Sequence, residues 1–319
     1  MNHERTTTPT NADDIDFSNP NLLDLRVDYA FKLFFTTGGT HRLKSLLNAI
    51  FENKQIPRIV SSLAVVNPSL EKAAVEDKLS VLDIRAILSD GTTVCVEMHL
   101  YDLLGLKYKS LRSWARAYGE ELAPGQRYQE QNMVVCISFL DGPVTDAAGN
   151  PIEKVHSLFQ VMERDSHDTL LPDLEMHYIN MKAFVKHCEE MEASVTDHDM
   201  FTQWLAMITQ KGIKDKEKIK RICAGEEMQD AMETLTNLSQ DKIKRQAYQR
   251  RLDELYFYNK MVCENEEYYH KITEQSAALS DKDAALAEQS AALADKDAAL
   301  ADKDAEIVRL RAQLGERSK

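Results

Sequence analysis

The chain has 319 residues, of which 43% are hydrophobic, and a formal net charge of −13 at pH 7. This length and apolar content suffice for one full hydrophobic core and leave room for a second module. The acidic balance argues against a protein that coats nucleic acid nonspecifically, because phosphate binding requires clustered Lys and Arg. It does not argue against an enzyme with a local basic patch.

The cysteines and the start of the chain indicate the cellular compartment. Five cysteines are spread along the sequence without any CxxC pair, so we expect neither a disulfide framework nor a zinc site. Residues 1–20 lack the apolar core of a signal peptide, and no run approaches the roughly 18 apolar residues of a membrane span. We therefore expect a cytoplasmic protein that makes no membrane contact.

The first third of the chain predicts an arm, two helices and a strand. Residues 1–20 are rich in Thr, Asn and Asp, which predicts a flexible arm. From residue 22 to residue 50 apolar side chains recur at helical spacing, interrupted by Thr36-Thr37-Gly38-Gly39, which predicts two helices joined by a turn. Residues 59–66 are short, apolar and β-branched, as in a strand.

The middle of the chain predicts a sheet, and the part after it predicts helices. Residues 79–88 and 92–100 are expected to form a β-hairpin, and residues 103–122 a helix that ends before Ala123-Pro124-Gly125. Residues 133–139, MVVCISF, are apolar throughout, as in a central strand covered on both faces. Strands are also expected at 157–162 and 174–180. The expected domains are a sheet-containing domain at 21–182 and a helical region at 183–272.

Residues 273–319 contain a seven-residue repeat, which begins EQSAALS, DKDAALA, EQSAALA. One heptad position is apolar throughout and is occupied by Leu279, Leu286, Leu293, Leu300, Ile307 and Leu314. The position three residues earlier is polar, occupied by Ser276, Asp283, Ser290, Asp297 and Asp304. A firm coiled coil needs both positions to be apolar. The repeat therefore predicts a helical tail that is solvated or only weakly homo-oligomeric.

The hairpin places two carboxylates opposite each other. If Ser89-Asp90-Gly91 is a three-residue loop, Gly91 takes the left-handed conformation that such a loop needs. The register then pairs Leu88 with Thr92 and, further out, Asp83 with Glu97. Nearly the whole reverse face is apolar, which supports this register independently. A two-residue loop would instead put Asp83 and Glu97 on opposite faces.

Directly opposed carboxylates repel each other, and a divalent cation between them removes that cost. Oxygen ligands favour Mg²⁺ or Mn²⁺ over zinc, and such a cation could activate water for phosphodiester hydrolysis. The spacing alone favours another interpretation, in which Asp83 and Glu97 are the exposed face of a half-solvated hairpin, because polar faces are common on antiparallel strand pairs.

Four blocks carry a resemblance to a known family: LDLRVDYAFKLFF, DKLSVLDIRAILSDGTTVCVEMH, WARAYGEEL and MVVCISFLD. In content and order they resemble the Rpn family of recombination-promoting nucleases and putative transposases, part of the PD-(D/E)XK superfamily. The resemblance runs from about residue 22 to residue 260 and excludes the heptad tail. It implies an α/β, restriction-endonuclease-like fold, with a mixed β-sheet flanked by helices, followed by the helical C-terminal region and the tail.

The resemblance also implies roles for individual residues. The family's metal-binding Asp corresponds to Asp83 and its second acidic residue to Glu97. The third motif position, Lys in the superfamily and usually Gln in this family, is His99 here. A neutral imidazole can bind a metal or position water, but it cannot supply the constant charge of Lys.

Further positions match the family outside the hairpin. Lys109 falls where the family often carries a basic residue, which implies a phosphate contact, although a solvated lysine accounts for it equally well. Asp28 and Lys32 match a D-x-x-F-K block, for which we expect a packing role before a catalytic one.

Two functional hypotheses follow. The first is a metal-dependent DNA endonuclease, using Mg²⁺ or Mn²⁺ at Asp83 and Glu97 with His99 orienting water or substrate, and acting in recombination or transposition. The second is a nuclease-fold protein without effective catalysis that binds DNA or protein partners. Other chemistries lack motifs: there is no GxxxxGK[ST] loop and no GxSxG elbow. The remaining histidines have no ligand spacing, so we expect surface or core positions for His156, His177, His187 and His198.

Overall fold

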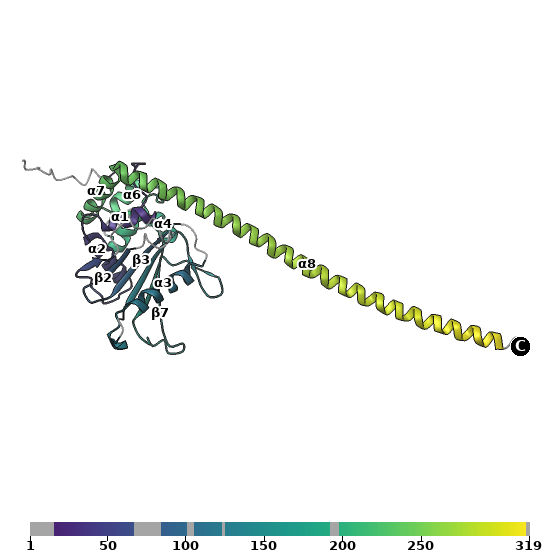
Figure 1. Ribbon diagram of the computed structural model, residues 1–319. Coiled ribbons are helices and arrows are strands. Elements are labelled where there is room, and N and C mark those ends of the chain that lie inside the picture. Colours follow the sequence, from purple (N-terminus) through teal and green to yellow (C-terminus); the bar gives the residue numbers. More distant parts are fainter. Residues whose placement is uncertain (1–15, 67–83, 101–104, 123–124, 192–197, 317–319) are drawn as a thin grey trace, which may run out of the picture. The chain divides into compact units, whose positions relative to one another are not determined.

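The computed structural model describes residues 16–66, 84–100, 105–122, 125–191 and 198–316 (Figure 1). The chain divides into two units, residues 1–257 and residues 258–319. The first unit contains the sheet and the helices around it. Among the described residues, no helix combines the length and the apolar character needed to cross a membrane.

A six-stranded mixed sheet forms the centre of the first unit. β3 and β4 pair in parallel, as do β4 and β8, whereas the outer pairs β1–β2, β2–β3 and β7–β8 are antiparallel. The fold is therefore α/β with a mixed sheet, as predicted. In spatial order the strands are β1 (Leu63–Val65), β2 (Ile84–Leu88), β3 (Thr93–His99), β4 (Val134–Leu140), β8 (Leu174–Asn180) and β7 (His156–Gln160).

Most helices of the first unit cover one face of this sheet and share its main core. The predicted helix pair is present, and Gly38 and Gly39 in the turn between the two helices both have positive φ. Phe31 packs against Phe139 of β4, with ring centroids 5.4 Å apart. These helices are α1 (Asp28–Thr36), α2 (His41–Asn53), α4 (Met181–Glu190), α5 (Met200–Ile208), α6 (Lys216–Ile222) and α7 (Glu226–Gln240).

The opposite face of the sheet is covered by α3 (Leu106–Glu120), which lies across the sheet in Figure 1. Leu106 packs with Tyr178 of β8, and Ala117 packs with Cys136 of β4. A small hairpin of β5 (Val144–Thr145) and β6 (Pro151–Ile152) adjoins this layer through Val144 and Ile152. A short 3-10 helix, η3 (Tyr128–Glu130), precedes β4. We did not predict β5, β6 or η3.

The strand expected at residues 59–66 is shorter than predicted, because a side chain forms hydrogen bonds with the backbone of its first half. The Val60 N–H donates to the Asn48 Oδ1 at 2.7 Å, and the Asn48 amide donates to the Val60 carbonyl at 3.2 Å. Backbone groups that bond to a side chain cannot also join a ladder. Pairing with β2 therefore begins only at Leu63.

The last helix, α8 (Lys242–Glu316), is continuous and passes residue 272 without a break. Its first part, up to residue 257, belongs to the first unit, and the remainder forms the second. Within the second unit Leu279 and Leu286 are 62% and 59% exposed. The domain boundaries expected at 182/183 and 272/273, and weak pairing of the tail, stay predictions.

Candidate active site

The β2–β3 hairpin has the predicted turn and register wherever it is described. Gly91 has φ +87°, and its N–H donates to the Leu88 carbonyl at 3.0 Å. Ile87 pairs with Thr93 and Arg85 with Cys95, as the three-residue loop requires. A Cβ at Gly91 would also approach the Asn132 Oδ1 to 2.8 Å, so both conformation and space favour glycine here.

The structure describes only one of the two predicted carboxylates, Glu97. Asp83 lies outside the described residues, and with it the pairing of Asp83 with Glu97. β2 begins at the next residue, Ile84, which pairs with Val96. Glu97 lies on β3 and is only 3% exposed. The interpretation of Glu97 as part of an exposed hairpin face is therefore wrong, because α3 covers that face.

Two side chains donate hydrogen bonds to the Glu97 carboxylate. The His99 Nε2 lies 3.0 Å from the Glu97 Oε2. A carboxylate only accepts hydrogen bonds, so this nitrogen carries the hydrogen and donates it. The Ser113 hydroxyl on α3 also donates to the Glu97 carboxylate. On β4, Ser138 is the register partner of Glu97. His99 is itself only 9% exposed, so the pair is enclosed rather than solvated.

The surroundings of Glu97 favour its charged form. Burial raises the pKa of Glu97, but the hydrogen bond and charge of His99, the charge of Lys109 and the Ser113 hydroxyl together hold that pKa below its ordinary value. The site therefore contains a buried, ionised carboxylate at neutral pH. An ionised carboxylate at a central strand is a suitable oxygen ligand for Mg²⁺ or Mn²⁺.

The other predicted residues lie at different distances from this pair. Lys109 is exposed on α3, close enough for its charge to act on Glu97. Asp28 lies elsewhere and pairs with Arg251 of α8, whose Nε lies 3.0 Å from both carboxylate oxygens. Lys32 is fully buried in α1. Asp28 thus joins two helices of the first unit, which fits the packing role expected for it.

A metal site needs more than the two residues brought together here. In the described ranges, no group of three or more His, Cys, Asp or Glu side chains is arranged to hold a metal ion. Glu97 supplies one oxygen donor. While the His99 Nε2 donates to Glu97, that nitrogen cannot also ligate a metal. The donor set fits a divalent cation through Glu97, and Asp83, which would complete it, lies outside the described residues.

A row of interacting polar side chains is buried on the other face of the sheet, and we did not predict it from the sequence. His156 and His177 are both in the core, and the His156 Nε2 lies 2.9 Å from the His177 Nδ1. The row continues from the His156 Nδ1 to the Asn53 Oδ1 at 2.8 Å. At its other end the His177 Nε2 lies 3.6 Å from the Glu175 carboxylate, which Arg58 holds at 2.8 Å. The alternation of Glu175 and His177 along an apolar strand was the available signal.

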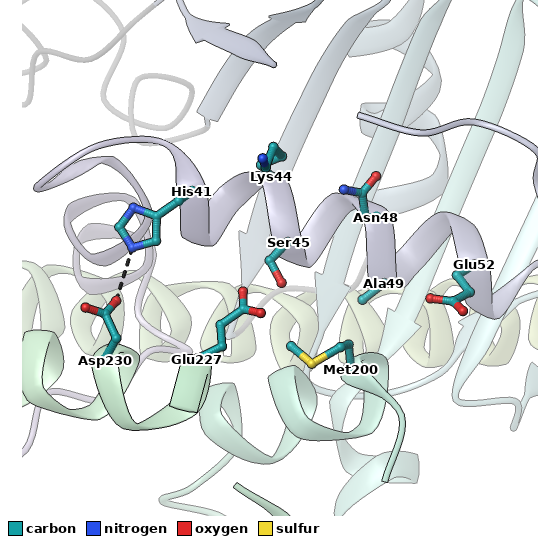
Figure 2. A pocket seen from close by; sticks show the side chains of 9 residues that line it. All are labelled: His41, Lys44, Ser45, Asn48, Ala49, Glu52, Met200, Glu227 and Asp230. Atoms are coloured by element: carbon teal, nitrogen blue, oxygen red, sulfur yellow. Dashed lines mark hydrogen bonds and ion pairs between the residues drawn. The ribbon is translucent and has the colours of Figure 1, made fainter. Parts of the chain in front are cut away.

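A surface pocket of about 520 Å³ lies over α2, α5 and α7 (Figure 2). His41 points toward Asp230 across it, with the ring Nε2 3.1 Å from the carboxylate. A second hollow of about 860 Å³ lies beside the first part of α8. Neither hollow is lined by Glu97 or His99, so the buried carboxylate site is separate from both.

A mixed sheet with helices on both faces and a buried carboxylate on a central strand define a protein of the restriction-endonuclease-like class. The chain belongs to the PD-(D/E)XK nuclease family transposases, whose family model matches residues 25–265. Its function is therefore related to nuclease or transposase activity, and nucleases of this family act on DNA and generally use divalent metal ions. Searches of the curated proteins and of the solved structures found no significant match.

Proposed function

We propose that the chain is a DNA endonuclease that hydrolyses phosphodiester bonds with Mg²⁺ or Mn²⁺ held by Asp83 and Glu97. The observation that supports this most is the buried, ionised carboxylate of Glu97. Burying a charge is costly unless partners compensate it, and such groups are concentrated at functional sites. Continuing the β2–β3 register by one residue beyond Ile84 would bring Asp83 opposite Glu97.

Each residue then has a distinct task. Asp83 and Glu97 would hold the metal, which when bound supplies a Lewis acid and a water of lowered pKa. His99 donates to Glu97 and so fixes the orientation of that carboxylate. Ser113 assists from α3. Lys109 contributes positive charge beside the site, where negative charge develops on the phosphoryl oxygens and on the leaving sugar oxygen.

The histidine at the third motif position acts in this proposal as a positioning residue. A Lys there would contribute a permanent charge, whereas His99 contributes a donor to Glu97. Gln, the usual residue of the family, is also a hydrogen-bond donor. We therefore expect the variant His99→Gln to cleave DNA, and His99→Leu, which lacks a donor, to lose activity through misplacement of Glu97.

Cleavage of plasmid and of a linear duplex, with Mg²⁺ or Mn²⁺, tests the proposal. Glu97→Gln keeps the shape of the side chain but removes its charge, and should slow cleavage by more than about a hundredfold, equivalent to about 2.7 kcal/mol of transition-state stabilisation. Asp83→Asn should do the same. Glu52→Gln on α2, distant from the site, is the control. Equal rates in wild type and both site variants would overturn the proposal, and DNA binding without any cleavage would favour the noncatalytic alternative.

A further inference from the structure

The outer face of α3 carries a stripe of cations. Lys109, Arg112 and Arg116 are exposed and follow one another at intervals of three and four residues, which places them along one side of the helix. Two large exposed side chains flank them on the same helix, Tyr108 at 70% and Leu111 at 48%. The inner side of the same helix packs on the sheet, so this stripe is the surface that α3 presents outward.

This helix is basic on an acidic chain. Its sequence, LKYKSLRSWARAYGE, holds four cations and a single carboxylate, Glu120. Arg116 pairs with Glu120 at 3.1 Å, but Glu120 is shared with Arg85 at 2.8 Å. Neither Lys109 nor Arg112 forms an ion pair with any residue that the structure describes. Neighbouring like charges on a helix repel, so this charge is kept at a small cost in stability.

The stripe adjoins the candidate active site. Ser113, on the inner side of α3, donates to Glu97, and the charge of Lys109 acts on the same carboxylate. A polyanion held along the outer side would therefore lie against the helix that covers Glu97. From residue 109 to residue 116 the helix rises about 10.5 Å, which equals about three steps of 3.4 Å along one strand of a DNA duplex.

We propose that the outer stripe of α3 is the track on which the DNA backbone lies, with Lys109, Arg112 and Arg116 each contacting a phosphate. Tyr108 packs against a sugar or a base, as exposed aromatic side chains do in strand-binding surfaces. The inference rests on the proposed function for the identity of the polyanion, and it adds the surface that holds the substrate. On a chain of net charge −13, such a local stripe also orients the strand, because the rest of the surface offers less attraction.

Binding of a fluorescent 30-base-pair duplex to the full chain, measured by anisotropy in EDTA over a range of NaCl concentrations, tests the track. The variant Lys109→Gln/Arg112→Gln should lower the slope of log K against log salt by about 1.8 and weaken binding about sixtyfold at 0.1 M salt, if each lost phosphate contact contributes about 0.9 to the slope. Lys109→Arg/Arg112→Lys should bind as the wild type. Arg164→Gln/Lys186→Gln removes two exposed cations elsewhere and is the matched control.

The outcomes separate the track from the catalytic proposal. If Lys109→Gln/Arg112→Gln binds with the wild-type slope and affinity, or if the matched control weakens binding as much, the track is wrong even where the wild type cleaves DNA. If the slope falls as expected but no variant and no metal gives cleavage, the track stands and the endonuclease proposal fails. A wild-type chain that does not bind the duplex at all overturns the track as well.

Discussion

The buried pair His156 and His177 predicts how the stability of the first unit depends on pH. Burial first, and then the charges of His177 and Lys54, lower the pKa of His156 from 6.5 to about 2. Burial also lowers the pKa of His177, against the opposing effect of Glu175, with Arg58 and Lys54 acting in the same direction as burial. Both rings therefore stay neutral in the folded protein at pH values where the unfolded chain takes up protons.

The sign and size of the effect follow from proton binding. Below pH 6.5 the unfolded state binds a proton at His156 that the folded state does not bind until about pH 2. The free energy of unfolding therefore falls as the pH falls through 6.5. For a histidine that stays neutral in the folded state, the loss between pH 8 and pH 5 is about 2 kcal/mol. His177 adds to the loss in the same direction.

Urea denaturation at pH 8, 7, 6 and 5, followed by tryptophan fluorescence, measures this loss. The variant His156→Asn removes the titrating ring, so its stability should fall by about 2 kcal/mol less than that of the wild type over this range. His167→Asn changes an exposed histidine and should follow the wild-type curve. Parallel curves for wild type and His156→Asn would refute the reasoning, because they would show that His156 takes up its proton equally in both states.

Three further predictions concern packing, each measured by urea denaturation at pH 7. Arg251→Met leaves the Asp28 carboxylate without its partner and should cost about 3 kcal/mol, part of which Asp28→Asn in the same chain should restore; an unchanged midpoint would contradict a structural role for the pair. Gly91→Ala should cost about 1–2 kcal/mol because of its positive φ, and a neutral result would mean that the turn rearranges. Trp204→Phe should cost about 1–3 kcal/mol, since the fully buried indole also donates a hydrogen bond to α2.

The parts of the fold that sequence predicts well are those set by local pattern. The hairpin register follows from Gly91 and from the alternation of apolar residues on either side of it, and it holds at every described pair. β8 occupies the same residues as predicted, 174–180. The strand at 59–66 was overestimated because the side chain of Asn48, outside the segment, bonds to Val60.

The parts that sequence could not predict depend on contacts between distant residues. Glu97 looks exposed from the hairpin alone, and only the position of α3 makes it buried. Asp28 and Arg251 meet across 223 residues of chain, so no spacing rule links them. The histidine chain joins α2 to two strands that are not adjacent to it in sequence. In each case the residue type was visible, but its partner was not.

The continuity of α8 gives its repeat a geometric consequence. A helix rises about 1.5 Å and turns about 100° per residue, so one seven-residue repeat adds about 10.5 Å and returns the leucine position to within about 20° of its previous direction. Gaining or losing a whole repeat would therefore change the length of the helix, while the leucine position keeps almost the same direction around the helix axis. An insertion of a few residues that is not a whole repeat would instead rotate the following part of the helix about the helix axis. Whole repeats thus allow the length of α8 to change in uniform steps, with little change in the direction of its leucine position.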